Sequence, residues 1–171
     1  MRILSGKFAG RDLTSPHDFR VRPTAEHVRG AMLDALSAHI ANARVLDLFA
    51  GTGALGLEAI SRGAHSADFV ETRPSSLHAL RANIALLRLR DRVRVFKRDA
   101  VPFAAALLAD RYDIAFADPP YESRMLDRIV DSWSTTRFSR ILVVEHARTH
   151  DIAPTSNRIL LDQTAVSIYG V

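Results

Sequence analysis

Five apolar segments recur between residues 44 and 145, and segments with one apolar and one polar face separate them. The apolar segments are rich in Val, Ile, Leu and Phe, which is typical of strands buried on both faces of a parallel sheet. They predict strands at 44–49, 66–71, 92–97, 112–117 and 140–145. The intervening segments have the period of a helix, and they predict helices at 54–63, 74–89, 101–110 and 123–133.

The alternation of strands and helices predicts the fold class. It favours an α/β protein with a doubly wound, mostly parallel sheet and right-handed crossovers. Two further apolar stretches flank Asp162 and Gln163, and they predict a closing antiparallel hairpin within residues 157–171.

The N-terminal part of the chain has a different pattern. The segments on either side of residues 7–10 predict a small two-stranded hairpin, and apolar positions on one face predict a helix that begins at Thr24 as N-cap. We expect a single domain, residues 1–171, in which residues 1–40 form an appendage docked on a sheet unit of residues 41–171.

Composition narrows the class of protein. The chain has 171 residues, no cysteine and a net charge of +4. Without cysteine, disulfides and thiolate-bound zinc or iron–sulfur sites are excluded. The N-terminus contains no apolar leader, and the longest apolar run, residues 103–109, is too short to cross a bilayer. We therefore expect a soluble, cytoplasmic protein.

The basic residues are unevenly distributed along the chain. Residues 1–30 carry six Arg or Lys against three Asp or Glu, and residues 88–98 carry six against one. Both segments are candidate contacts for a polyanion such as nucleic acid. The second segment has an equally good structural interpretation, as an edge strand whose charges prevent pairing with other chains.

A G-x-G-x-x-G motif at Gly51, Gly53 and Gly56 follows the first strand and opens a helix, which is the signature of a dinucleotide-binding turn. Asp47 interrupts that strand four residues before the first glycine, where it would repel a pyrophosphate anion. An acid there suits a cationic, amino-acid-like ligand, such as the methionine moiety of S-adenosylmethionine. The alternative is a strand-end carboxylate bonded to loop amides.

Two more acids follow predicted strands. Glu71 ends the second strand, where it can accept both hydroxyls of a ribose, as in NAD and S-adenosylmethionine sites alike. Asp99 follows the third strand, where its carboxylate and the amide of Ala100 can bond the edge of an adenine. An N-cap for the next helix is an equally good interpretation of Asp99.

The tetrapeptide Asp118-Pro119-Pro120-Tyr121 directly follows the fourth strand. Because the carboxyl ends of parallel strands form one crevice, it is expected beside the glycine loop. Two prolines fix the backbone and remove two N–H donors, so carbonyl oxygens can face a ligand. An exocyclic amine can then donate to Asp118 and to the Pro119 carbonyl while its base stacks on Tyr121. A rigid turn with an N-capping Asp is the structural alternative.

Such a pocket suits methylation of a nucleobase amine. The nitrogen of this amine is a poor nucleophile because its lone pair is delocalised into the ring. Acceptors around the nitrogen favour a pyramidal geometry aimed at a methyl donor, and they stabilise the positive charge that develops. Asp118 or solvent would take the surplus proton.

Several segments carry a resemblance to a known family, namely residues 46–64, residues 117–121 and the N-terminal GKFAGRDL and RPTAEHVRGAMLDAL. Over nearly its whole length, the chain resembles the bacterial 16S ribosomal RNA guanine-N2 methyltransferases of the small, single-domain type. The resemblance implies a Rossmann-like class I methyltransferase fold, with a seven-stranded, mostly parallel sheet whose last strand is antiparallel.

The resemblance also implies S-adenosylmethionine as cofactor and 16S rRNA, in the small ribosomal subunit or its assembly intermediate, as partner. The residues expected to bind the cofactor are Asp47, Phe49, Ala50, Gly51, Thr52, Gly53, Gly56, Glu71, Asp99 and Ala100. Those expected to hold the target base are Asp118, Pro119, Pro120 and Tyr121. The N-terminal appendage is expected to bind RNA through Lys7, Arg11, Arg22, Thr24 and Arg29.

Three other interpretations remain open. A DNA or RNA adenine-N6 methyltransferase would share the pocket, although 171 residues leave no room for the separate target-recognition domain of a DNA enzyme. A nicotinamide oxidoreductase fits the glycine motif but leaves Asp47 and the Asp-Pro-Pro-Tyr segment unexplained. A non-catalytic RNA-binding assembly factor would not need that segment. The seven histidines show no metal-ligand spacing, and we expect a monomer with neither a metal nor a membrane contact.

Overall fold

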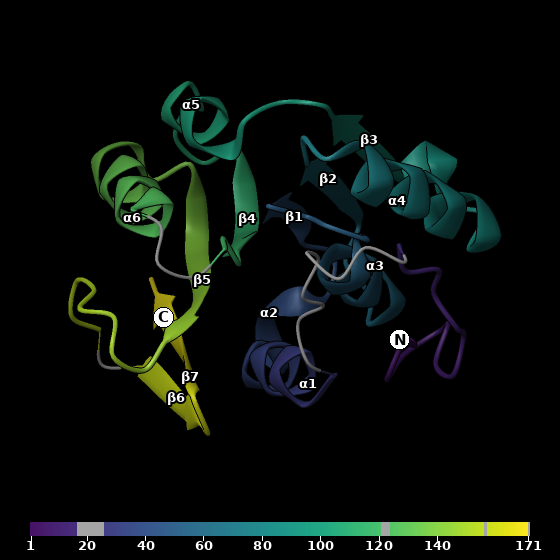
Figure 1. Ribbon diagram of the computed structural model, residues 1–171, viewed down its shortest axis with the longest axis horizontal. Helices are drawn as coiled ribbons and strands as arrows, with labels where there is room; N and C mark the ends of the chain where they lie inside the picture. The colour runs from purple at the N-terminus through teal and green to yellow at the C-terminus, as the bar shows by residue number, and fades with distance from the viewer. Residues whose placement is uncertain (17–25, 121–123, 156, 171) are drawn as a thin grey trace.

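A computed structural model of the chain describes residues 1–16, 26–120, 124–155 and 157–170. Its centre is a seven-stranded sheet with the strand order β3-β2-β1-β4-β5-β7-β6 (Figure 1). The strands are β1 (Arg44–Leu48), β2 (Ser66–Val70), β3 (Val93–Phe96), β4 (Tyr112–Ala117), β5 (Ser139–Ala147), β6 (Asn157–Leu161) and β7 (Thr164–Tyr169). Among the described residues, β7 is antiparallel to both of its neighbours, β5 and β6, and the other strand pairs are parallel. The predicted α/β fold, with the last strand antiparallel, is confirmed.

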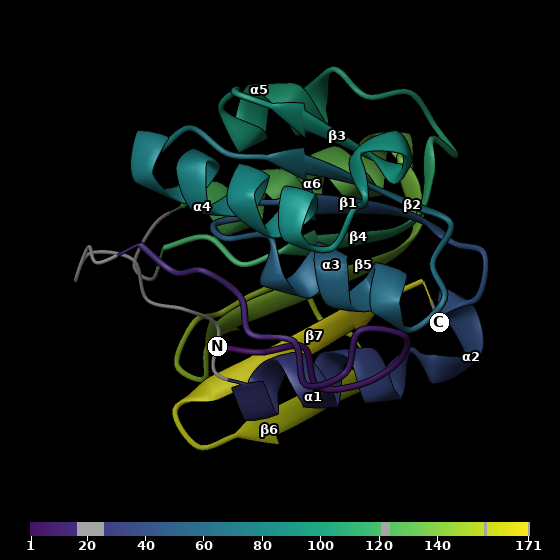
Figure 2. The same ribbon diagram turned by 90° about the vertical axis from the view of Figure 1, so that its right-hand side faces the viewer.

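Helices cover both faces of the sheet. They are α1 (Glu26–Ala35), α2 (Ser37–Ile40), α3 (Ala54–Ser61), α4 (Pro74–Leu86), α5 (Ala100–Ala105) and α6 (Met125–Thr136), with a short 3₁₀ turn, η1 (Arg90–Arg92). Helices α1 to α4 share one hydrophobic core with the N-terminal segment, and α5 and α6 share the core of the opposite face (Figure 1, Figure 2).

The strand order creates a switch point between β1 and β4. From β1 the chain proceeds through β2 to β3 on one side, and from β4 it proceeds to β5 on the other. In open parallel sheets, ligands bind at such a point, in the crevice outside the carboxyl ends of the strands. The fold therefore positions the loops after β1 and β4 for a shared ligand site.

The predicted elements differ from the structure mainly at helix ends. The predicted N-terminal helix divides into α1 and α2 at Leu36, whose backbone has φ −100° and ψ 7°. Leu36 is fully buried, so the break between α1 and α2 lies at a residue that packs in the core. The helix predicted at 101–110 ends at Ala105, and Asp110 has a positive φ of 54°. Single-sequence periodicity does not detect such local backbone changes.

The N-terminal segment folds back on itself as predicted, but one isolated antiparallel bridge between Arg2 and Asp12 replaces the expected pair of strands. Its turn is anchored to the end of α3, because the Lys7 amide donates to the Ser61 carbonyl oxygen at 2.8 Å. Gly6 has a φ of 82°, and a Cβ there would lie 2.0 Å from the same oxygen. Glycine is therefore required for this close approach.

Strand β3 lies at the edge of the sheet, as one interpretation of residues 88–98 expected. Arg92 donates to the His65 carbonyl oxygen at 2.9 Å. Arg94 donates to Asp68 at 2.9 Å. These two arginines are engaged locally, and contact of the segment with a polyanion stays a prediction.

Candidate functional site

A cavity of about 470 Å³ opens beyond the carboxyl ends of β1, β2, β3 and β4, beside Glu145 of β5. Its walls come from the loops after these strands and from the first turns of α3, α4 and α5. The volume is typical of a small-molecule site. Its position agrees with the switch point between β1 and β4.

The glycine loop forms one wall of this cavity. Phe49, Ala50, Gly51 and Thr52 all line it. Gly51 has a φ of 55°, and a Cβ added there would meet no atom within 4 Å. The backbone at Gly51 therefore borders open space into which a ligand can come close.

Gly53 and Gly56 belong to the same motif but have a different task. Neither is among the described residues that line the cavity. A Cβ at Gly53 would approach the Leu80 side chain to 2.3 Å, and one at Gly56 would approach the Phe69 ring to 2.5 Å. Gly53 thus allows close packing against α4, and Gly56 allows α3 to pack closely on the sheet. Contact of these two glycines with a cofactor stays a prediction.

Asp47 lies at the base of the cavity and is only 3% exposed. Its Oδ2 accepts a hydrogen bond from the Gly56 amide at 3.0 Å. Burial raises the pKa of Asp47 well above its ordinary value, the Gly56 amide lowers it, and the charges of Asp118 and Glu71 raise it further. A cationic group in the cavity would stabilise the ionised carboxylate. The hydrogen bond from the Gly56 amide and the ligand role expected of Asp47 are thus compatible.

Glu71 links the loops after β1 and β2. One carboxylate oxygen accepts the Gly51 amide at 2.8 Å. The other accepts the amides of Thr72 at 2.7 Å and Arg73 at 2.8 Å. These bonds fix the orientation of the carboxylate on the cavity wall before any ligand is bound.

Asp99 is the N-cap of α5, since its Oδ1 accepts the Val101 amide at 3.0 Å. The capping interpretation is therefore confirmed. Asp99 and Ala100 also line the cavity, so the cap holds the carboxylate where an adenine edge could reach it. That contact with an adenine stays a prediction.

Asp118, Pro119 and Pro120 line the same cavity as the glycine loop. The negative charge of Asp118 contributes to raising the pKa of Asp47, after burial, which is the main cause. Tyr121 lies outside the described residues. The structure thus brings the proline corner and the glycine loop together, whereas the catalytic roles stay predictions.

Several residues of the cavity were not anticipated from the sequence. They are Met1, Ala54, Leu55, Val70, Thr72, Arg73, Ser76, Arg98, Met125 and Glu145. Glu145 follows the pattern of Glu71, an acid at the end of an apolar strand, and that signal could have found it. No comparable signal marks Ser76, because one hydroxyl in a first helical turn is ordinary.

The acids of the cavity wall test whether it fits a polar ligand. Asp47 is buried with one backbone amide as donor, and Glu71 is fixed on the wall by three backbone amides. A buried carboxylate is costly unless donors or a positive charge face it. The cavity therefore fits a ligand that brings hydroxyl groups for Glu71 and a positive charge for Asp47, as S-adenosylmethionine does.

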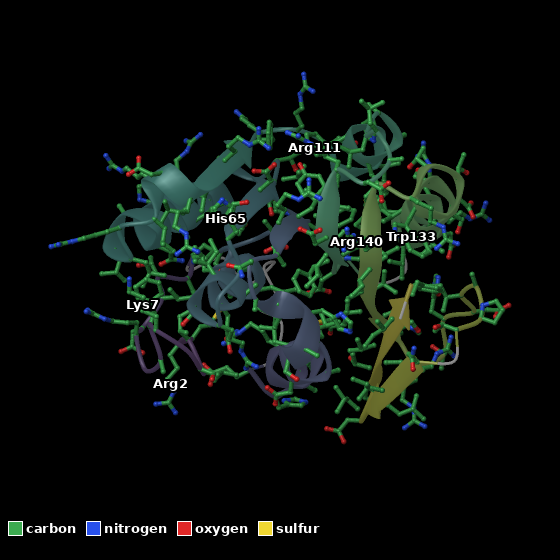
Figure 3. The ribbon with its side chains drawn as sticks, turned by 180° about the vertical axis from the view of Figure 1, so that it is seen from behind. Arg2, Lys7, His65, Arg111, Trp133 and Arg140 are labelled. Atoms are coloured by element: carbon green, nitrogen blue, oxygen red, sulfur yellow. The ribbon has the colours of Figure 1, made fainter. Side chains whose placement is uncertain are left out.

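The predicted RNA-binding residues lie in three different situations. Lys7 and Arg11 are exposed on the N-terminal hairpin, and Figure 3 shows Lys7 and Arg2 on the same side of the molecule. Arg22 and Thr24 lie outside the described residues.

The prediction that Arg29 contacts RNA phosphates is wrong in this structure. Arg29 is 0% exposed, and its Nε donates to Glu58 at 2.7 Å. A second guanidinium nitrogen donates to the Arg2 carbonyl oxygen. Arg29 therefore links α1 to α3 and to the hairpin, and it cannot reach a surface phosphate.

Candidate metal clusters and membrane-spanning helices are both absent from the described residues. Within them, no group of three or more His, Asp or Glu could hold a metal ion. Across the same ranges, every helix is too short or too polar to span a membrane.

The sequence of this chain is similar to the sequences of several known proteins. Ribosomal RNA small subunit methyltransferase D of Escherichia coli is 36% identical over 131 residues, which cover 77% of this chain and 65% of that protein. A Bacillus subtilis protein, YlbH, carries a provisional rRNA methyltransferase name. It is 29% identical over 180 residues, which cover 99% of this chain and 98% of that protein.

A solved structure agrees with the fold. The Escherichia coli protein yhhF, which carries a provisional methyltransferase name, superimposes with a TM-score of 0.85 at 29% identity, covering 98% of this chain and 96% of that chain. The family model described as Conserved hypothetical protein 95 matches residues 1–164. This chain therefore belongs to the Conserved hypothetical protein 95 family, to which the resemblance in its glycine loop and Asp-Pro-Pro-Tyr segment had pointed.

Proposed function

We propose that this protein transfers a methyl group from S-adenosylmethionine to the exocyclic N2 amino group of a guanine in 16S ribosomal RNA. The observation that carries the proposal is one cavity lined by Gly51, Asp47 and Glu71 on one side and by Asp118 and Pro119 on the other. The names of the Escherichia coli and Bacillus subtilis relatives support rRNA as the substrate.

The cofactor half of the cavity provides matched groups. Glu71 would accept the ribose hydroxyls, and its bonds to three backbone amides hold it in place for this. Asp47 would face the cationic methionine moiety, and Asp99 with Ala100 would bond the adenine edge. When bound, S-adenosylmethionine supplies an electrophilic methyl group whose bond to sulfur breaks with the electron pair left on sulfur.

The proline corner would hold the target base. The N2 amine would donate one hydrogen to Asp118 and the other to the Pro119 carbonyl oxygen, which turns its lone pair toward the methyl carbon. As the N–C bond forms, the nitrogen becomes positive, and the Asp118 carboxylate stabilises this charge. Asp118 or solvent then takes the one surplus proton, so the product amine is neutral. Tyr121 would stack on the base.

Binding of RNA would use the N-terminal part of the chain. Lys7 and Arg11 are exposed there, and we propose that they contact phosphates together with Arg22 and Thr24. The target base must leave its stack to reach the cavity.

Methyl transfer to ribosomal particles tests the proposal. Small-subunit particles and free 16S rRNA from a strain lacking the enzyme would be incubated with the protein and tritiated S-adenosylmethionine, and the labelled nucleoside would be mapped. We expect label in N2-methylguanosine at one position. Label in N6-methyladenosine would favour the adenine enzyme, and absence of label from both RNAs would contradict the proposed function.

A further inference from the structure

Glu145 lies beside the proposed catalytic corner but has no part in the reaction as described so far. It is on β5, which pairs with β4 through Ala117 and Val144. The next residues along these two strands are Asp118 and Glu145, and both line the cavity. Adjacent strands are about 4.8 Å apart. The structure therefore places two residues with carboxyl groups side by side on the wall of one cavity.

The position of Glu145 is fixed by the sheet. Its backbone is held between β4 and β7, where it is the register partner of Val166. The residue is 5% exposed, and its side chain therefore reaches the cavity from within the protein. Because Glu145 lines the cavity, its carboxylate can accept a hydrogen bond from a ligand bound there.

The Watson–Crick edge of guanine supplies such donors. If Asp118 and the Pro119 carbonyl accept the two N2 hydrogens, the ring nitrogen beside the amine on the Watson–Crick edge is N1, which carries a hydrogen in guanine. The corresponding ring nitrogen of adenine, beside its exocyclic amine, is unprotonated and presents a lone pair. A carboxylate next to Asp118 would therefore attract guanine and repel adenine.

We propose that Glu145 accepts the N1–H of the target guanine and selects it over bases whose N1 is unprotonated. The inference rests on the proposed function, because it assigns the base that the same cavity takes. It adds that the acceptor on β5 determines specificity, whereas Asp118 and Pro119 recognise only the amine.

The test compares two target bases in wild-type and variant protein. The substrate RNA carries at its mapped position either guanine or 2-aminopurine, which keeps the 2-amino group but has an unprotonated N1. We expect the wild type to prefer guanine by at least about 10³-fold in kcat/KM, because a site that bonds an N–H rejects an analogue without it. Glu145→Gln has an amide that can donate to an unprotonated N1, so we expect the preference to fall by about 100-fold or more.

Three measurements separate a contact of Glu145 with the base from an effect on cofactor binding or on folding. Affinity for S-adenosylmethionine should change less than about threefold in Glu145→Gln, and a loss of cofactor affinity equal to the loss of turnover would overturn the assignment to the base. Glu145→Asp keeps the carboxylate one methylene further back, so we expect slower guanine methylation with the preference retained. Unchanged kcat/KM in Glu145→Asp would count against the proposal even if Glu145→Gln did not fold.

The outcomes separate this inference from the proposed function. If the wild type forms N2-methylguanosine and Glu145→Gln keeps the full preference for guanine over 2-aminopurine, the inference alone fails. If the wild type forms no N2-methylguanosine, the proposed function fails and the inference fails with it. A collapse of the preference with intact cofactor binding supports both.

Discussion

Two buried carboxylates, Glu58 on α3 and Asp47 on β1, have opposite surroundings. Glu58 is 0% exposed and is paired with two arginines, Arg29 at 2.7 Å and Arg62 at 2.9 Å. Asp47 is 3% exposed, accepts one backbone amide, and has no arginine or lysine partner among the described residues. Within the described residues, the charge of Glu58 is thus neutralised by arginines. The charge of Asp47 can instead be balanced by a cationic ligand in the cavity.

The difference separates structural from ligand-binding charge. A buried ion pair satisfied within the protein links elements, here α1, α3 and the N-terminal hairpin. A buried acid next to an open cavity, with a pKa raised mainly by burial, is more costly in the empty protein than in a complex with a cation. Five variants test structural and ligand-binding charges of the molecule, and they follow from the largest expected effect to the smallest.

Breaking the internal pair should affect stability most. Arg29→Met leaves Glu58 with one arginine in a buried site, and we expect it to lower the free energy of unfolding by about 3–5 kcal/mol. Urea denaturation measures this. Arg44→Ala, which removes an exposed pair with Asp113, is the control and should cost less than about 1 kcal/mol. A loss for Arg29→Met no larger than that of the control would contradict a structural role.

Removing the acid at the proline corner should affect chemistry. For Asp118→Ala we expect kcat to fall by about 10²–10³-fold, as when one preorganised electrostatic partner of a reacting group is lost. Affinity for S-adenosylmethionine, measured by calorimetry, should stay within about threefold. Retained turnover would remove Asp118 from the reaction, and equal losses of binding and turnover would make it a cofactor ligand.

Neutralising Asp47 should weaken cofactor binding. Loss of a hydrogen bond to a charged group costs about 1.5–3 kcal/mol, so we expect Asp47→Asn to bind S-adenosylmethionine about tenfold to 100-fold more weakly. Glu145→Gln provides an isosteric control elsewhere in the cavity. Unchanged affinity in Asp47→Asn would show that the loop amide is the main partner of this acid.

The same variant has a pH signature in the ligand-free protein. Because the pKa of Asp47 is raised in the folded state, the folded protein binds more protons than the unfolded chain between the ordinary carboxyl pKa and the raised one. Stability therefore falls as pH rises through that window. The free energy of unfolding of Asp47→Asn should decrease less over this pH window than that of the wild type. Denaturation at several pH values measures the difference. An identical pH dependence in both proteins would contradict the raised pKa.

The smallest effects are expected at the surface. If Lys7 and Arg11 contact phosphates, each substitution by Ala should reduce the slope of log affinity against log salt by about 0.7–0.9. Arg140→Ala is a matched control, because Arg140 is exposed at the amino end of β5, away from the cavity. Unchanged slopes for Lys7→Ala and Arg11→Ala would remove the hairpin from the RNA interface.

The sheet was predictable from the sequence because its strands are continuous apolar runs. The predicted strand at 112–117 matches β4, and the predicted closing hairpin matches β6 and β7. The loops after β1 and β4 were also predictable as neighbours, since the carboxyl ends of parallel strands share one edge.

Arg29, Gly56 and Glu145 show where the sequence was insufficient. A helical arginine is usually exposed, and only the position of Glu58 on α3 explains why Arg29 is buried. The tasks of Gly53 and Gly56 depend on Leu80 and Phe69 behind them. These contacts join residues far apart in the chain, so local patterns do not reveal them.

The most direct test of the central claim is a crystal structure of the protein with S-adenosylmethionine. We expect the ribose hydroxyls on Glu71, the methionine ammonium near Asp47 and the methyl-bearing sulfur turned toward Asp118 and Pro119. A cofactor bound outside this cavity, or one whose sulfur faces away from the proline corner, would contradict the account.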